Sequence, residues 1–205
     1  MLQIINANTC EPEPDVFMDI WHCNATGVYS GVSASGNGNG DDDSSLDETF
    51  LRGIQKSDEN VLTHNANNTT ELANGTISGL LSTHPSHIGR LFFDQDLISQ
   101  VESLSLYTTN TQKLTTNAND DILAGEAAAI DPFKEYVLLG EDVSDGISAW
   151  ISVAIDPTAD RELRPAAYYP SDGGFENENS AMGGGPGGSA PGGAAPSGTC
   201  APMEM

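Results

Sequence analysis

One alternating segment in the second half of the chain limits the possible folds more than any other feature. From Ile147 to Ile155 every second residue is an aliphatic Ile, Ala or Val, with Ser, Trp and Ala between them. Side chains alternate between the two faces of a strand, so this pattern predicts a β-strand with one buried face. The segment Glu135–Leu139 is its predicted partner, and Asp145-Gly146 between them is a hairpin turn signal.

Four further segments have strand patterns. Leu2–Asn6 is short and apolar, Phe50–Gln55 follows a polar loop, and 61–63 (Val-Leu-Thr) interrupts a polar stretch. Val16–His22 carries apolar groups on both faces, so we predict that it is a central strand of its sheet. Short strands separated by frequent turns are typical of an all-β sandwich.

Helical patterns are few. Leu97–Leu104 places its apolar residues on one face, and either Asp94 or Asp96 could cap its N-terminus. The alanine-rich segment Asp121–Ala129 favours a second short helix. The fold class is therefore predicted to be mainly β, a β-sandwich core with one or two short helices.

The chain divides by composition near residue 156. Residues 1–156 can form a sandwich domain, which is close to the common domain size of roughly 100–150 residues. Residues 157–205 lose the strand pattern, and Gly183–Gly198 is rich in Gly, Pro, Ala and Ser. We expect this second part to be a disordered Gly/Pro-rich C-terminal tail.

The charge of the chain argues against two classes of partner. Thirty Asp and Glu residues stand against seven Lys and Arg, for a net charge of −23. This charge repels phosphate backbones and anionic headgroups, so neither nucleic acid nor a membrane surface is an expected partner. No run of about 18 apolar residues occurs that could span a bilayer. The sequence carries no signal for oligomeric state.

Glycosylation motifs and cysteines bear on the compartment. Four sequons occur, at Asn24, Asn67, Asn68 and Asn74. They predict an extracellular protein, although residues 1–5 resemble a strand and no secretion signal, so we expect that the natural N-terminus lies upstream. Cys10 and Cys23 could pair in an oxidising compartment, which would leave Cys200 in the tail unpaired.

Four segments together resemble one enzyme family across residues 1–156. They are Val16–Tyr29 with the sequence -DIWHCNATGVYSG- at its end, Phe50–Gln55, His87–Asp94 and Glu135–Asp156. These segments resemble the intradiol ring-cleavage dioxygenases, and within that family the fungal extracellular members. The resemblance implies a β-sandwich.

The resemblance also implies a chemistry. Members of the family hold one Fe(III) with two tyrosines and two histidines, because phenolate oxygens stabilise ferric iron and imidazoles complete the site. The partners are a catechol-type aromatic and dioxygen, and the ring opens to a muconate-type diacid with the metal as template and Lewis acid. Tyr29 matches the position of the first tyrosine ligand.

The other family ligands have no counterpart in this chain. No tyrosine occurs between Tyr29 and Tyr107, no His-x-His occurs anywhere, and the arginine that precedes that motif is absent. The pattern indicates an internal deletion of about one strand between Asn60 and Val61. A mis-spliced gene product would have this pattern.

The four histidines do not match ligand positions. His22 on its strand is expected to pack or hydrogen-bond, and His64 follows the deletion point as an ordinary polar residue. His84 and His87 flank Pro85, which places them in a turn rather than on a metal-binding helix.

The sequence thus predicts an Fe(III)-dependent intradiol dioxygenase-like protein that is impaired, with weak or no activity and doubtful iron occupancy. Tyr29 is the one retained metal-ligand position. The alternative is a non-catalytic, secreted β-sandwich that acts as a binding module.

Overall fold

A computed structural model describes residues 1–33, 36–40, 42–57, 66–67, 70–74, 77–78, 84–161, 167–168 and 172–176. The strand predicted at 61–63 and the tail predicted at Gly183–Gly198 lie outside these residues. The division of the chain at residue 156 therefore stays a prediction.

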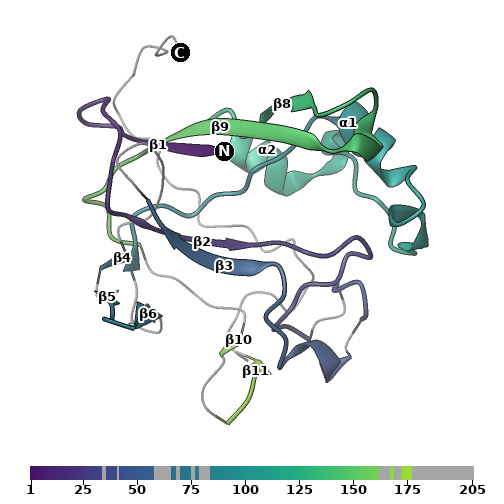
Figure 1. Ribbon diagram of the computed structural model, residues 1–205, viewed down its shortest axis with the longest axis horizontal. Coiled ribbons are helices and arrows are strands. Elements are labelled where there is room, and N and C mark those ends of the chain that lie inside the picture. The colour runs from purple at the N-terminus through teal and green to yellow at the C-terminus, as the bar shows by residue number, and fades with distance from the viewer. Residues whose placement is uncertain are drawn as a thin grey trace.

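The alternating segment forms the centre of a three-stranded sheet with the order β1-β9-β8 (Figure 1). The strand β9 (Ile147–Ile155) pairs in parallel with β1 (Leu2–Asn6) and antiparallel with β8 (Glu135–Leu138). This confirms the predicted pair of strands. The hairpin connection is longer than a two-residue turn, because a 3-10 turn at Val143–Asp145 precedes Gly146, whose φ is 100°.

The second layer is a hairpin of β2 (Phe17–Trp21) and β3 (Arg52–Lys56), paired antiparallel. Figure 1 shows this hairpin below the three-stranded sheet, so the two sheets form the layers of a sandwich. The prediction of a central position for β2 is wrong, because β3 is its single strand partner among the described residues. Ile20 of β2 is accordingly 47% exposed, although Met18 is buried.

The main core lies against the three-stranded sheet. Ile4 of β1 packs with three residues of β9, Ile151, Val153 and Ile155, all nearly inaccessible to solvent. These side chains come from the alternating positions that the sequence pattern places on one face. The buried face of β9 is therefore the one that its sequence pattern predicts.

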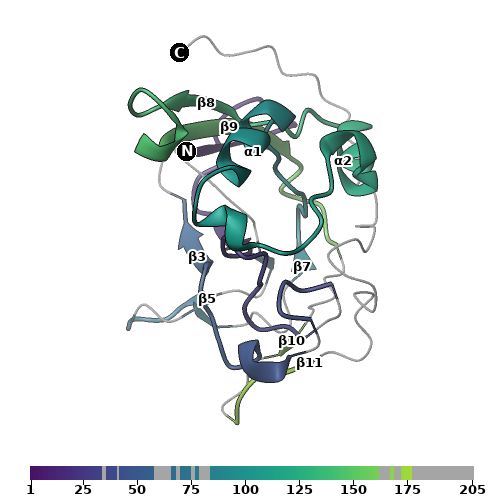
Figure 2. The ribbon, with the colours of Figure 1, turned by 90° about the vertical axis from the view of Figure 1, so that its right-hand side faces the viewer.

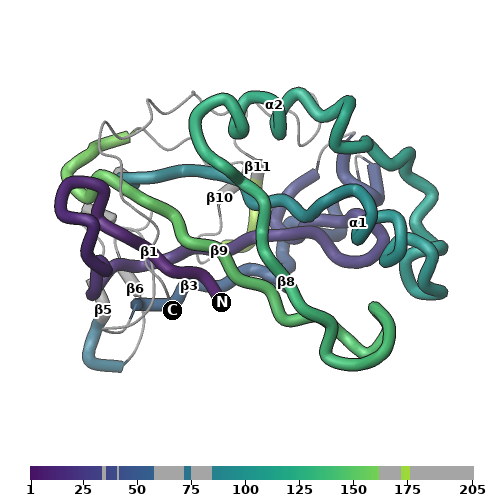
Figure 3. Tube along the Cα trace, turned by 90° about the horizontal axis from the view of Figure 1, so that it is seen from above, coloured from purple at the N-terminus to yellow at the C-terminus, as the bar shows by residue number. Residues whose placement is uncertain are grey.

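Two short helices accompany the three-stranded sheet (Figures 2 and 3). They are α1 (Gln95–Glu102) and α2 (Asp121–Ala127). Asp94 caps α1 by accepting a hydrogen bond of 2.8 Å from the amide of Leu97. Asp120 caps α2 in the same way, through the amides of the second and third helical residues. Both helices are confirmed, and Asp94 rather than Asp96 is the cap of the first.

The remaining described elements are short. The two-residue strands pair as β4 (Ala66–Asn67) with β7 (His84–Pro85), β5 (Thr70–Glu71) with β6 (Ile77–Ser78), and β10 (Ala167–Tyr168) with β11 (Phe175–Glu176). The 3-10 turns are η1 (Asp43–Ser45), η3 (Tyr107–Thr109), η4 (Asn117–Asn119) and η5 (Val143–Asp145). No helix in the described ranges is long and apolar enough to cross a membrane.

The predicted disulfide between Cys10 and Cys23 is not formed. Cys10 is in a disulfide, whereas Cys23 is a free thiol, so a bond between these two is excluded. Cys10 follows β1 in the three-stranded layer and Cys23 follows β2 in the other, which separates the two residues that the sequence places only thirteen positions apart.

Removing the cap of α1 is expected to destabilise the protein. Asp94→Ala leaves the amide of Leu97 without its acceptor, and we expect a loss of about 1 kcal/mol in the free energy of unfolding, measured by urea denaturation. Asp94→Asn retains a capping oxygen and should cost much less. Equal losses in the two variants would show that charge, not capping, is what Asp94 supplies.

Candidate functional site

Tyr29 is positioned by a tight turn that follows β2. The Oδ1 atom of Asn24 accepts hydrogen bonds from the amides of Thr26 (2.9 Å) and Val28 (3.1 Å). Gly27, inside the turn, has a φ of 78°, which favours glycine over residues with a side chain. The -DIWHCNATGVYSG- segment thus encodes a strand, a fixed turn and a tyrosine at a defined place.

A buried amide holds the backbone of Tyr29 on both sides. Asn37 accepts a hydrogen bond of 2.7 Å from the Tyr29 amide and donates one of 3.2 Å to the Tyr29 carbonyl. Asn37 is 2% exposed. The following Gly38 lies against the backbone of Thr26 and Gly27, so a Cβ has no room there. These two residues do not stand out in the sequence by themselves, although the Gly-Asn-Gly-Asn-Gly run that contains them is the signal of a tightly constrained loop.

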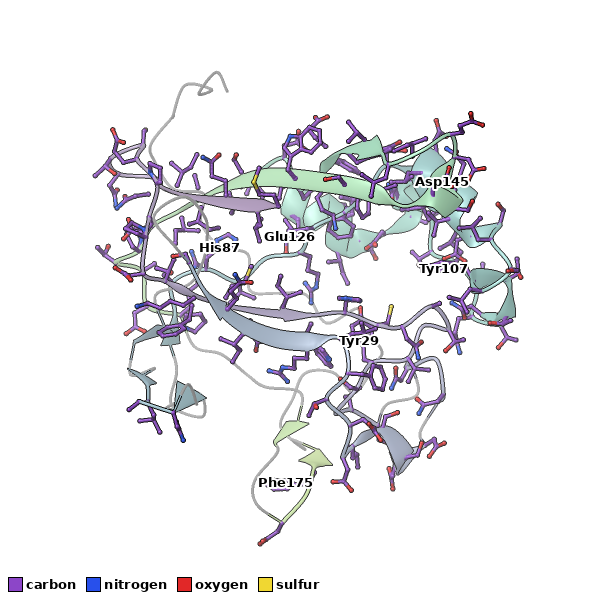
Figure 4. All side chains as sticks on the ribbon, in the orientation of Figure 1. Tyr29, His87, Tyr107, Glu126, Asp145 and Phe175 are labelled. Atoms are coloured by element: carbon purple, nitrogen blue, oxygen red, sulfur yellow. The ribbon has the colours of Figure 1, made fainter. Side chains whose placement is uncertain are left out.

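The ring of Tyr29 is half-buried. The Trp21 ring contacts it edge-on, with centroids 4.9 Å apart and planes at 64°. The thiol of Cys23 is hydrogen-bonded to the Tyr29 hydroxyl, and the guanidinium of Arg90 acts on it electrostatically. The indole Nε1 of Trp21 is buried without a hydrogen-bond partner in the described structure. Figure 4 shows Tyr29 near the end of the β2–β3 layer.

Burial keeps this site protonated. Desolvation, followed by the neighbouring Cys23, raises the pKa of Tyr29 to about 12, although Arg90 opposes the shift. Burial likewise raises the pKa of the Cys23 thiol. At neutral pH the site therefore presents a phenol and a thiol rather than their anions.

Arg90, which acts on Tyr29, also forms an ion pair with a residue of helix α2. Arg90 lies 3.9 Å from the carboxylate of Glu126 in α2, and burial raises the pKa of that carboxyl group. Figure 4 shows Glu126 beneath α2, across the sandwich from Tyr29. Arg90 thus interacts electrostatically both with the phenol that follows β2 and with a carboxylate of α2.

The described donors do not fit ferric iron. Within the described part of the chain, no three His, Cys, Asp or Glu side chains converge on one point. The Cys23 thiol that is hydrogen-bonded to the Tyr29 hydroxyl is protonated, and Arg90, which acts on that hydroxyl electrostatically, is a cation, so neither group is a ferric ligand as it stands. The family's set of two phenolates and two imidazoles is therefore not assembled by these residues.

Neither His22 nor His87, the two histidines whose side chains the structure describes, joins Tyr29. The Nδ1 atom of His22 lies 2.8 Å from the carbonyl oxygen of Cys23, which agrees with the predicted hydrogen-bonding role. His87 lies at the opposite end of the strands from Tyr29 (Figure 4). His84 lies in β7, so the turn predicted around Pro85 is a short strand, and His64 lies outside the described residues.

The protonation of Tyr29 has a measurable consequence. Below pH about 10 both the folded and the unfolded chain hold this proton, but above it the unfolded chain releases the proton first. The stabilising contribution of Tyr29 is thus present below pH 10 and lost between about 10 and 12. We expect the free energy of unfolding to fall more steeply with pH in this window in the natural chain than in Tyr29→Phe. Parallel pH profiles would show that the phenol is not shielded.

Known proteins resemble the chain in fold. No family model matches the sequence, and no curated protein matches it. The solved intradiol ring-cleavage dioxygenase from Tetranychus urticae shares 21% identity, with a TM-score of 0.55, over 78% of this chain and 80% of that one. The dioxygenase Tetur07g02040 shares 20% identity, with a TM-score of 0.51, over the same fractions. The chain is thus similar in fold to intradiol dioxygenases, and the predicted sandwich is confirmed.

Proposed function

We propose that this chain is an intradiol ring-cleavage dioxygenase-like protein whose catalytic site is impaired. The parent reaction is the Fe(III)-dependent opening of a catechol-type ring by dioxygen. The proposal rests on the position of Tyr29. The -DIWHCNATGVYSG- segment places this residue after a strand of a sandwich that is similar in fold to the intradiol dioxygenases. Tyr29 is the residue that would contribute to holding the metal.

Weak or absent turnover follows from the chemistry of the remaining groups. In the family, ferric iron binds the deprotonated catechol and makes its ring reactive towards dioxygen. Here no His-x-His exists to add imidazoles, and no second tyrosine lies between Tyr29 and Tyr107. Metal affinity depends on ligand number and on the groups that orient the ligands, and both are reduced.

Oxygen consumption with catechol tests the proposal. Purified protein incubated with ferrous and then ferric salt should consume dioxygen no faster than Tyr29→Phe treated in the same way. A muconate-type product formed by the natural chain and not by the variant would establish an intact catalyst.

The second candidate is a non-catalytic binding module. Its support is the donor-rich environment of Tyr29, in which the unpartnered Nε1 of Trp21 and the charge of Arg90 suit a ligand with acceptor oxygens. Trp21 fluorescence that changes on adding a catechol in the absence of metal, and that no longer does so in Arg90→Gln, would favour this candidate.

The proposal also covers where the protein is located and how the internal deletion arose. We propose an extracellular protein, and the four sequons support this proposal. Transcript reads that insert a tyrosine and a His-x-His between Asn60 and Val61 would make the chain a mis-spliced product of an active gene. Reads that join these two residues directly support an inherited deletion.

A further inference from the structure

The turn that follows β2 contains a glycosylation motif whose three residues are all described. Of the four sequons in the chain, Asn24-Ala25-Thr26 alone lies wholly within the described ranges. The sequons that begin at Asn67, Asn68 and Asn74 each include residues outside those ranges. Only for Asn24, therefore, does the structure define the whole motif and the side chain that would carry a sugar.

The oxygen of the Asn24 side chain is committed to the turn. Oδ1 accepts hydrogen bonds from the amides of Thr26 (2.9 Å) and Val28 (3.1 Å) and from the hydroxyl of Thr26 (2.8 Å). Two of these donors are backbone amides, which cannot accept, so the atom that faces them must be the oxygen of the side-chain amide. Asn24 thus closes the turn that positions Tyr29 through Oδ1.

The nitrogen of the same side chain has no such role. Among the described residues, Nδ2 of Asn24 donates no hydrogen bond. The buried side-chain atoms without a partner in the described structure belong to Trp21, Asn39 and Ser86, so Nδ2 of the half-buried Asn24 is open to solvent. An amide is planar, and with Oδ1 turned into the turn, Nδ2 on the other branch points out of it.

The turn by itself does not require an asparagine at this position. An aspartate would supply the same acceptor oxygen without the nitrogen, and both residues are common in turns of this kind. An N-glycosidic bond, in contrast, is made through Nδ2 and leaves Oδ1 free to accept. The three hydrogen bonds of the turn are therefore compatible with a sugar on the same side chain.

We propose that Asn24 carries an N-linked glycan on Nδ2, while its Oδ1 continues to hold the turn that positions Tyr29. The inference rests on the proposed extracellular location, because the sugar comes from an oligosaccharide on a lipid pyrophosphate in the secretory pathway. The bond from Nδ2 to C1 of the first sugar forms, the bond from C1 to the pyrophosphate oxygen breaks, and Nδ2 loses one proton. The modification requires neither iron nor turnover.

Site mapping on the full chain, secreted from insect cells behind an added signal peptide, tests the proposal. Enzymatic release of N-glycans in heavy-oxygen water converts a glycosylated asparagine to a labelled aspartate, and we expect the label at residue 24 in most molecules. Thr26→Ser keeps the hydroxyl of the sequon and should keep the label. Thr26→Val removes the hydroxyl and should reduce the label at least about tenfold. A sample incubated without the enzyme is the control for deamidation.

The turn supplies a second test, because a sugar on Nδ2 should leave the bonds of Oδ1 intact. The glycosylated protein should unfold at a urea concentration no lower than the enzymatically deglycosylated protein. Asn24→Ala, which removes Oδ1, should unfold at a lower urea concentration than either.

Three results would overturn the site. They are no label at residue 24 in the natural chain, an equal label in Thr26→Val, or a glycosylated protein less stable than its deglycosylated form. Should Thr26→Val fail to be secreted, the label in the natural chain, compared with the sample without enzyme, decides the matter. Because secretion is imposed on the chain, a failure here is distinct from a failure of the proposed location or of the dioxygenase ancestry.

Discussion

Replacing Asn37 with alanine is expected to lower the free energy of unfolding by about 3 kcal/mol, because several enclosed backbone groups lose their partners together. The side chain accepts from the amides of Tyr29 (2.7 Å) and Gly38 (3.1 Å). It also donates to the carbonyls of Tyr29 (3.2 Å) and Val32 (3.2 Å). Chemical denaturation followed by circular dichroism measures the loss.

Asn39→Ala is the matched control in the same loop. Asn39 donates to the carbonyl of Asp42 and the hydroxyl of Ser45, but its own Oδ1 is buried without a partner in the described structure. Its removal should therefore cost far less than the loss of Asn37. Asn37→Asp retains an acceptor for the Tyr29 amide and should lie between the two. An Asn37→Ala variant no less stable than Asn39→Ala would show that the loop does not hold Tyr29.

Truncation of Ile155 is expected to cost a similar amount for a different reason. Ile155 is 2% exposed and packs in the core cluster of β1 and β9. Ile155→Ala removes buried methyl groups and leaves a cavity, which typically costs about 2–5 kcal/mol. For a chain of this size we expect the melting temperature to fall by about 10 °C. Differential scanning calorimetry measures this shift.

Leu139→Ala is the control for the core variant. Leu139 follows β8 and is 65% exposed, so its truncation should change stability by less than about 0.5 kcal/mol. Equal effects of the two substitutions would mean that β9 does not form the principal core.

The long regular elements could be predicted from the sequence, because their information is local. Strict alternation defined Ile147–Ile155, and an apolar stripe preceded by Asp94 and Asp96 indicated α1, although the sequence did not decide which aspartate caps it. The edge position of β2 could not be predicted in this way. Apolar groups on both faces of Val16–His22 suggested a central strand, but the number of neighbours depends on segments distant in sequence.

Of the candidate site, only Tyr29 could be predicted from the sequence. A continuous segment carries the strand, the turn and Tyr29, so its resemblance to a family could be read from the sequence. The groups that decide its protonation were not predictable, because Arg90 and Glu126 reach the site from other elements. The free state of Cys23 was missed for the same reason, since its sulfur faces Tyr29 and not Cys10.

The described contacts of Tyr29 do not include the ligands that ferric iron needs. Its hydroxyl is hydrogen-bonded to the Cys23 thiol and interacts electrostatically with Arg90, and desolvation raises its pKa to about 12. Among the described residues no three His, Cys, Asp or Glu side chains converge on one point. Metal affinity depends on ligand number, so we expect Tyr29 alone to hold iron poorly.

Iron content and visible absorption of the purified protein after incubation with ferric salt test this description most directly. We expect a colourless protein with trace iron after desalting, because no His-x-His accompanies Tyr29 and no three His, Cys, Asp or Glu side chains converge among the described residues. A stoichiometric iron content with a tyrosinate-to-iron charge-transfer band that disappears in Tyr29→Phe would overturn it. That result would indicate an intact ferric site.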